Sequence, residues 1–133
     1  MSVTRDFSKR IGNVFIPIAG PVAVCSGSHR GDIEPMLEGW DVLSLLQTLV
    51  SADDVDKTKP DPAPYLLAAA RLSLDPARCV AIEDSPAGIA AARAAGFRVH
   101  AVCHTFERAR LGDAHQVHDH ISELSLDSIL DCV

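Results

Sequence analysis

Glu83 and Asp84 are the residues of this sequence whose types are best suited to chemistry. Adjacent carboxylates supply the hard oxygen ligands that Mg²⁺ prefers, usually together with water and phosphate. The pair comes after an apolar run, Cys79 to Ile82, and before Ser85 and Pro86, which are typical of the start of a helix. Acids also interact favourably with the dipole at a helix N-terminus. These residues alone support a magnesium site and simple dipole pairing equally.

Two further stretches carry groups that suit an anion. Ser26-Gly27-Ser28 follows the apolar run Val22 to Cys25, so its hydroxyls and N–H groups are expected at the carboxyl edge of a sheet, where α/β folds bind phosphate. Taken alone, a serine cap with a flexible turn is the better explanation. Lys59, beside Pro60, can present one fixed positive charge to a phosphoryl group, although a surface lysine is the simpler interpretation.

The elements that must position these groups follow from the pattern of apolar residues. From residue 21 onward, β-branched runs alternate with alanine- and leucine-rich stretches, which is typical of βαβ units. Each run is almost wholly apolar, as strands buried on both faces are. The sequence therefore predicts an α/β, Rossmann-like parallel sheet with flanking helices. Its strands are expected at Val22–Cys25, Thr48–Ser51, Cys79–Ile82 and Arg98–Val102.

Helix signals lie between these runs. Ser85 at the cap, Pro86 at the first position and Gly96 just past the end mark the clearest helix. Asp61 and Pro62 open another. Its residues at one-face spacing are expected to cover the sheet: Tyr65, Leu66, Ala69 and Leu72. A shorter helix is expected around residues 33–37 and a terminal one over Ser125–Leu130.

Residues 1–20 differ from the rest of the chain. Their isolated apolar run, Val14 to Ile18, is closed by Ala19, Gly20 and Pro21. We expect residues 1–20 to be an N-terminal linker or lone strand, a remnant of a cap, and residues 21–133 to form one partial α/β core domain.

The order and spacing of the three polar stretches give a resemblance. Over about residues 21–105 the chain resembles the haloacid dehalogenase superfamily, in particular its β-phosphoglucomutase-like and phosphoglycolate phosphatase-like sugar-phosphate enzymes. The likeness rests on Ser26, on Lys59-Pro60-Asp61-Pro62 and on Val80-Ala81-Ile82-Glu83-Asp84-Ser85-Pro86-Ala87-Gly88.

The resemblance implies a role for each matching residue. Ser26 would hydrogen-bond the transferring phosphoryl group, with Gly27 in the same loop. Lys59 would be catalytic, neutralising that group and holding the charge of the nucleophile. Glu83 and Asp84 would hold Mg²⁺.

Ser28 and Arg30 match a loop that lies near the substrate in relatives, so they are weaker candidates for a second anionic group. The expected substrate is a small phosphorylated metabolite of the sugar-phosphate type, hydrolysed or isomerised by a phosphatase or phosphomutase-like enzyme.

The chain departs from the family pattern at its start. Family members begin with a strand that ends in two aspartates spaced by one residue; the first attacks phosphorus and the second protonates the leaving group. Asp6 is the only aspartate ahead of Ser26, and no buried strand precedes it. A literal Asp-x-Asp-x-Thr occurs at residues 54–58, just before Lys59, and we interpret it as a coincidence.

In the family the missing strand lies at the centre of the sheet, between the strands that end at Ser26 and Glu83, and a helical cap precedes this region. The loss would leave backbone groups unpaired, so we expect either that Val14 to Ile18 enters the gap or that the two flanking strands pair directly. We also expect poor turnover or none. A non-catalytic phosphate- and Mg²⁺-binding or interaction module is an alternative, as is a half-enzyme completed by another chain or by a homodimer.

Composition excludes some partners. The formal net charge is -6 and no cluster of Lys and Arg offsets it, so neither nucleic acid nor a membrane surface is an expected partner. Four cysteines without a C-x-x-C pair indicate reduced thiols and a cytoplasmic protein. No apolar run approaches the roughly 20 residues that a membrane span needs.

The remaining histidines and aromatic residues are assigned no function. The histidines at positions 104, 115, 118 and 120 fit no common zinc spacing, and their segment is interpreted as a solvated polar connection. Trp40 and Tyr65 are expected to pack against the core.

Overall fold

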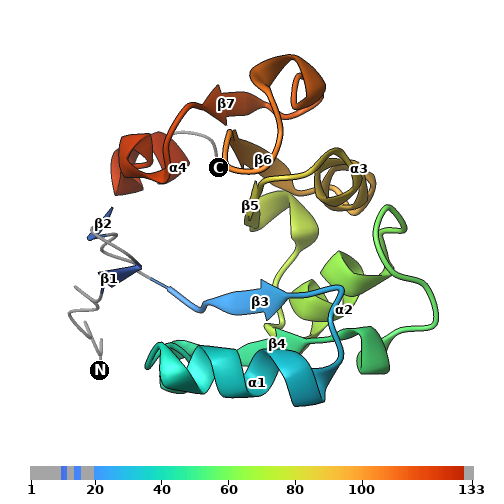
Figure 1. The fold of residues 1–133 in the computed structure, drawn as a ribbon. Helices are drawn as coiled ribbons and strands as arrows, with labels where there is room; N and C mark the ends of the chain where they lie inside the picture. Colours follow the sequence, from blue (N-terminus) through green and yellow to red (C-terminus); the bar gives the residue numbers. More distant parts are fainter. Residues whose placement is uncertain (1–9, 12–13, 16–19, 131–133) are drawn as a thin grey trace.

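The structure is a computed structural model in which residues 10–11, 14–15 and 20–130 are described. The strands are β1 (Arg10–Ile11), β2 (Val14–Phe15), β3 (Ala23–Cys25), β4 (Thr48–Val50), β5 (Val80–Glu83), β6 (Arg98–Val102) and β7 (Gln116–His118). The helices are α1 (Arg30–Gly39), α2 (Ala63–Arg71), α3 (Pro86–Ala94) and α4 (Leu126–Leu130). Strands and helices alternate from β3 onward, so the α/β prediction is confirmed (Figure 1).

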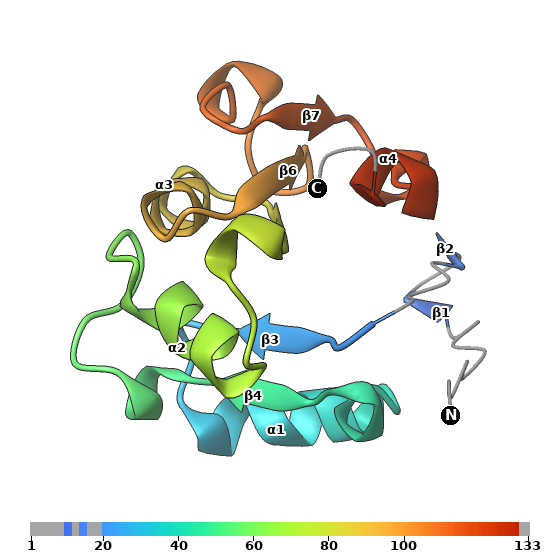
Figure 2. The same ribbon diagram turned by 180° about the vertical axis from the view of Figure 1, so that it is seen from behind.

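The parallel strands form two separate sheets. β3 pairs with β4, while β5, β6 and β7 pair in that order, and every one of these pairs is parallel. α2 packs on β3 and β4, α3 packs on β5 and β6, and the two helices contact each other. Seen from both sides, β3 and β5 lie apart with no strand between them among the described residues (Figure 2).

Neither expected way of closing the gap between β3 and β5 is seen in the described part of the chain. β2, which is the described portion of the run Val14 to Ile18, pairs antiparallel with β1, and residues 16–18 lie outside the described residues. β3 and β5 belong to different sheets and are not hydrogen-bonded to each other. The contact of α2 with α3 connects the two sheets, and no backbone ladder joins them among the described strands.

The helix boundaries follow their local capping signals. Ser85 caps α3 by accepting a hydrogen bond from the Gly88 N–H at 3.1 Å, Pro86 occupies its first position, and Gly96 adopts φ +91° after its end. Asp61 accepts a hydrogen bond from the N–H of Ala63 at the start of α2. These contacts confirm the expected start of α3. The start of α2 lies one residue later than expected, with Pro62 at the N-cap and Ala63 as the first helical residue.

The prediction that Leu66 lies on the face of α2 that covers the sheet is wrong. The buried residues of α2 are Pro64, Tyr65, Ala68 and Ala69. Leu66 is instead 46% exposed, because neighbouring residues lie about 100° apart around a helix and Tyr65 already faces the core.

The hydrophobic core lies mainly between α2, α3 and the three-stranded sheet. Tyr65 packs edge-on against Phe97, with 5.0 Å between ring centroids, and Ile89 and Leu111 are fully buried. Trp40 does not pack there as expected: it is 63% exposed at the C-terminal cap of α1, where a side chain at the end of a surface helix projects away from the sheet.

The segment interpreted as a solvated connection contains a strand, β7, which corrects that interpretation. A ring nitrogen of His118 lies 3.0 Å from a ring nitrogen of the fully buried His100, and His115 Nδ1 accepts the Val99 N–H. Burial, followed by the neighbouring His118, lowers the pKa of His100. A neutral imidazole therefore helps attach this edge strand, whose Gln and His residues lack the apolar pattern of the other strands.

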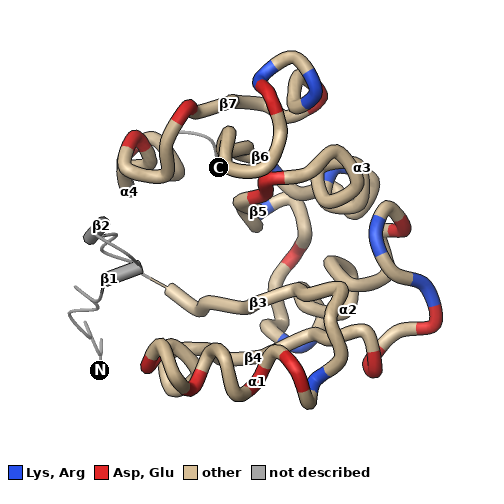
Figure 3. Tube along the Cα trace, in the orientation of Figure 1, with Lys and Arg blue, Asp and Glu red and all other residues tan. Residues whose placement is uncertain are grey.

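The described residues contain no group of three or more potential metal-ligating side chains, and no described helix is long and apolar enough to cross a membrane. Figure 3 shows the Lys and Arg positions of the described residues scattered along the trace and not gathered in one segment.

Candidate active site

Lys59 joins the carboxyl ends of β3 and β5. Its ammonium donates to the backbone carbonyl of Cys25 at 3.0 Å and lies 2.5 Å from Glu83 Oε1. The side chains of Lys59 and Glu83 are only 19% and 6% exposed, so the ion pair is shielded from water. Lysine, the end of β3 and the acid pair are thereby brought to one edge of the layer, as the parallel-sheet prediction requires.

Glu83 is enclosed on several sides. The same oxygen, Oε1, also accepts a hydrogen bond from the hydroxyl of Tyr65, which comes from α2. A Cβ added at Gly88 would overlap the Glu83 carboxylate, so the glycine makes room for it at the first turn of α3. Burial and the negative charge of Glu83 raise the pKa of Tyr65 well above its ordinary value, so the hydroxyl stays a hydrogen-bond donor.

Asp84 has different surroundings from its neighbour. It is half-buried, and its Oδ2 accepts a hydrogen bond from Thr105 Oγ1 at 2.9 Å. Thr105 follows β6, so this contact ties the loops after β5 and β6 together. The two acids predicted to act as a pair are thus divided, because Glu83 is committed to Lys59 and Tyr65 while Asp84 reaches the solvent-accessible edge.

The Ser26 loop continues directly from β3. The Ser26 N–H donates to the Val50 carbonyl at 2.9 Å, and Ser26 Oγ accepts the Ser28 N–H at 3.1 Å. Gly27 and Ser28 are exposed, and a Cβ added at Gly27 would meet no atom within 4 Å. The loop is therefore anchored at its base and open at its tip, next to the Cys25 carbonyl that Lys59 contacts.

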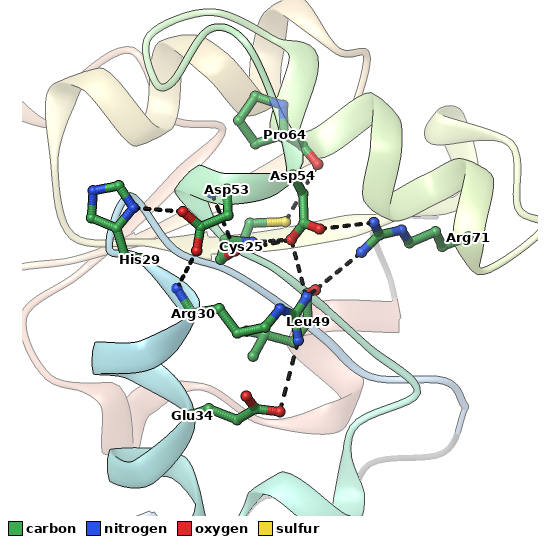
Figure 4. A network of polar contacts seen from close by, with 10 residues as sticks. Cys25, His29, Arg30, Glu34, Leu49, Asp53, Asp54, Pro64 and Arg71 are labelled. Atoms are coloured by element: carbon green, nitrogen blue, oxygen red, sulfur yellow. Dashed lines mark hydrogen bonds and ion pairs between the residues drawn. The ribbon is translucent and has the colours of Figure 1, made fainter.

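Arg30 lies in a different polar network (Figure 4). Its Nη2 donates to the Leu49 carbonyl at 2.9 Å and to Asp54 Oδ2 at 3.1 Å, and its backbone N–H donates to Asp53. Arg71 from α2 binds the same two partners, Leu49 and Asp54, at 3.1 Å each. The guanidinium predicted to lie near a substrate is thus engaged in joining α1, β4 and α2.

Asp54, the first acid of the literal Asp-x-Asp-x-Thr, has both carboxylate oxygens occupied. Oδ2 accepts the N–H and hydroxyl of Ser51 at 2.8 and 3.0 Å, and Oδ1 binds Arg71. The Ser51 N–H, more than any other group, lowers the pKa of Asp54 well below its ordinary value. An acid held in this way serves the fold, which supports interpreting the motif as a coincidence.

The Lys59 ammonium contacts the backbone of Cys25, whose thiol is a potential nucleophile. Burial raises the pKa of Cys25 to about 11, and its Sγ faces the Pro64 carbonyl at 3.7 Å. Since the thiolate is the reactive form, the neutral thiol supplies no nucleophile at neutral pH.

Sequence reasoning missed two residues that contact the acid pair, Tyr65 and Thr105. The only available signal for Tyr65 was its place in the first turn of the helix that follows Lys59, and this does not reveal a partner on β5. Thr105 had no signal, because its contact with Asp84 joins the loops after two different strands.

Comparison with known proteins places these motifs in a family. The haloacid dehalogenase-like hydrolase family matches residues 20–102. The chain is 34% identical over 113 residues to a validoxylamine A 7'-phosphate phosphatase of Streptomyces hygroscopicus subsp. limoneus, covering 85% of this chain and 53% of that protein. It is 41% identical over 76 residues to a fructose-1-phosphate phosphatase of Escherichia coli, covering 57% of this chain and 40% of that protein.

Solved structures of the family share the fold. A β-phosphoglucomutase from Clostridium difficile matches with a TM-score of 0.76 at 24% identity, covering 84% of this chain and 48% of that one. CbbY from Rhodobacter sphaeroides, in complex with xylulose-1,5-bisphosphate, matches with a TM-score of 0.75 at 28% identity, covering 82% and 51%. The chain spans about half the length of these proteins or less. By its matched residues and its fold, the chain belongs to the haloacid dehalogenase-like hydrolase family, whose relatives include phosphatases of phosphorylated sugars.

Proposed function

We propose that this chain is the phosphate-binding part of a Mg²⁺-dependent hydrolase of small phosphate esters of the sugar-phosphate type. The loop of Ser26 and Gly27 would bind the phosphoryl oxygens through a hydroxyl and backbone N–H groups, and Lys59 would neutralise their charge. The named relatives, one acting on fructose 1-phosphate and one on validoxylamine A 7'-phosphate, support this substrate class.

The observation that carries the proposal is the position of the Lys59 ammonium. It bridges the Cys25 carbonyl, next to Ser26, and the Glu83 carboxylate, next to Asp84. The three motifs recognised in the sequence therefore converge at the carboxyl ends of parallel strands, the usual ligand-binding edge of an α/β layer. A cation fixed there with little freedom is suited to a phosphoryl group.

The acid pair fits a magnesium ion unequally. Asp84 offers a half-buried carboxylate at the edge of the layer, and Mg²⁺ is commonly held by one or two carboxylates together with water and phosphate oxygens. Glu83 is less available, because Lys59 and Tyr65 share its Oε1. Asp84 would therefore be the principal protein ligand, and the ion would supply positive charge beside the bound phosphoryl group.

Turnover by this chain alone is proposed to be weak or absent, because Asp54, the first acid of the Asp-x-Asp-x-Thr motif, is engaged with Ser51 and Arg71. A half-enzyme completed by another chain is the second candidate. One observation favours it: among the described residues, β3 and β5 each have one edge that is hydrogen-bonded to no other strand. A strand supplied to that position would lie beside Lys59.

The test combines hydrolysis of p-nitrophenyl phosphate in the presence of Mg²⁺ with binding of inorganic phosphate, measured on the wild type and on Lys59→Met, Ser26→Ala and Asp84→Asn. We expect Lys59→Met to lower hydrolysis, or phosphate affinity where no turnover is seen, by about 10²-fold or more, the usual cost of removing one preorganised group. Asp84→Asn is expected to weaken Mg²⁺ binding more than phosphate binding.

Asp56→Asn, at an exposed position, serves as the matched control, since it changes the literal motif without touching Lys59. Asp54→Asn tests the motif directly and is compared with the wild type only where both are folded. Hydrolysis abolished by either change in folded protein would restore that motif as the nucleophile. A phosphate affinity that is unchanged in Lys59→Met and in Ser26→Ala would refute the proposed phosphate site. Binding without turnover would favour the phosphate- and Mg²⁺-binding module over the enzyme.

A further inference from the structure

Tyr65 is buried beside the proposed site, yet none of the motifs includes it. Its side chain is 6% exposed, and its hydroxyl donates to the same Glu83 oxygen that Lys59 contacts. Three elements therefore meet at one carboxylate: α2 through Tyr65, the loop before α2 through Lys59, and β5 through Glu83.

A buried carboxylate needs more than one partner. Removing an ionised group from water is costly unless hydrogen bonds and an opposite charge replace the lost solvation. Lys59 supplies the charge and Tyr65 a second donor, so neither has to satisfy the carboxylate alone. Gly88 closes the side toward α3, where any larger residue would displace the carboxylate.

The geometry links the hydroxyl of Tyr65 to the ammonium of Lys59. Glu83 holds Lys59 from one side and the Cys25 carbonyl holds it from another, so the direction of the ammonium depends on where Glu83 Oε1 is fixed. The Tyr65 ring adds a second contact, with Lys59 Nζ 5.2 Å from its centroid. The ring would remain in a phenylalanine, whereas the hydroxyl would not.

We propose that Tyr65 is a positioning residue of this site: its hydroxyl fixes the Glu83 carboxylate, and through it the Lys59 ammonium, at the end of β3. This rests on the proposed function for the role of Lys59 toward phosphate, but the positioning itself does not. Tyr65 acts on the lysine and not on the metal, because Asp84 is held separately by Thr105.

Tyr65→Phe isolates the hydroxyl, because the ring keeps its packing on Phe97. The first measurement is NMR of the lysine ammonium groups in isotope-labelled protein, where slow hydrogen exchange marks a held ammonium. The chain has only three lysines, Lys9, Lys57 and Lys59, and Lys57 is exposed, so it provides an internal reference. We expect a protected Lys59 signal in the wild type and, in Tyr65→Phe, exchange faster by about tenfold, approaching that of Lys57.

The second measurement compares ligand affinities across two variants. We expect Tyr65→Phe to weaken binding of inorganic phosphate by about tenfold and to leave Mn²⁺, used as a magnetic probe for Mg²⁺, nearly unaffected. Thr105→Val removes the hydroxyl that donates to Asp84. This change should weaken Mn²⁺ binding and leave phosphate binding nearly unaffected. A merely structural role for Tyr65 would weaken both ligands together.

The outcomes separate the two proposals. Wild type that binds no phosphate would end the proposed function, while the Lys59 signal would still test the positioning role. A Lys59 signal that is unchanged in Tyr65→Phe would overturn the inference whatever the ligands do.

A further measurement needs no substitution at position 65. The chain has a single tyrosine, so biosynthetic fluorotyrosine labels Tyr65 alone. Its fluorine signal should shift in Glu83→Gln and stay in place in Asp56→Asn. A fluorine signal that does not shift in Glu83→Gln would count against the hydrogen bond between Tyr65 and Glu83.

Discussion

At the scale of single residues, Gly88 shows how a small side chain serves a polar site. The Glu83 carboxylate occupies the space that a Cβ at this position would fill, and the Gly88 N–H is the donor to the Ser85 cap. Glycine normally weakens a helix because it has more freedom to lose on folding. Here that cost is offset by the room given to a buried charge and its two partners.

The first prediction concerns this glycine. Gly88→Ala should lower the free energy of unfolding by about 1–3 kcal/mol, the usual cost of overpacking, even though alanine favours a helix. Gly31→Ala is the control: Gly31 lies in the first turn of α1 with no atom within 4 Å of an added Cβ, and should gain about 0.5–1 kcal/mol. Urea unfolding of both variants measures the difference, and similar effects at the two positions would refute the steric argument.

At the scale of elements, the loop after β4 is the junction of α1, β4 and α2. Asp54 and the Leu49 carbonyl each bind both Arg30, from α1, and Arg71, from α2, while Ser51 closes the loop onto Asp54 (Figure 4). Two cations on one carboxylate leave little freedom for the ends of these helices. The junction fixes the half of the layer that carries the Ser26 loop.

Asp54→Asn is accordingly expected to lower stability by about 2–3 kcal/mol, the scale of hydrogen bonds to a charged group, without a specific loss of phosphate affinity. Asp56→Asn, at an exposed position two residues away, is expected to change stability by less than about 0.5 kcal/mol. Chemical denaturation of the two variants compares them directly.

The same prediction has a defined pH dependence. Because the folded state lowers the pKa of Asp54, its contribution is fully present above the ordinary aspartate value of about 3.9 and is lost as pH falls below it. The stability difference between wild type and Asp54→Asn should therefore be constant near neutrality and shrink in acid. A difference that grows in acid would contradict the assignment.

At the scale of the whole molecule, stability is expected to be uneven. β6 has hydrogen-bonded neighbours on both sides, and Val99 and Ala101 within it are fully buried. Within the described part of the chain β3 has one neighbour, and all three of its residues are only half-buried. The two sheets are connected through α2, α3 and the side-chain contacts of Glu83, so each can open without breaking a shared ladder.

Amide hydrogen exchange should reveal this division. We expect amides of β6 to exchange only on global unfolding and amides of β3 to exchange through a smaller opening, at least tenfold faster. Tyr65→Phe should increase the difference in exchange rate between β3 and β6, since it weakens a contact between the two sheets. Equal protection of β3 and β6 would show that the layer unfolds as one unit.

Local chemistry determined what the sequence by itself could predict. The bounds of α3 follow from Ser85, Pro86 and Gly96, because caps and first-turn prolines act within a few residues. The strands followed from apolar runs, and the approach of Lys59 to the end of β3 and to Glu83 agrees with the rule that parallel strands end at one edge.

The tertiary structure decided which partner each polar group takes. Nothing in the sequence separates Glu83 from Asp84, yet one is enclosed by Lys59 and Tyr65 and the other is held by Thr105. β7 was missed for a related reason, since its polar residues are held by contacts with β6. Such choices depend on distances between elements some 20 residues apart in the chain, and only packing of helices on sheets fixes those distances.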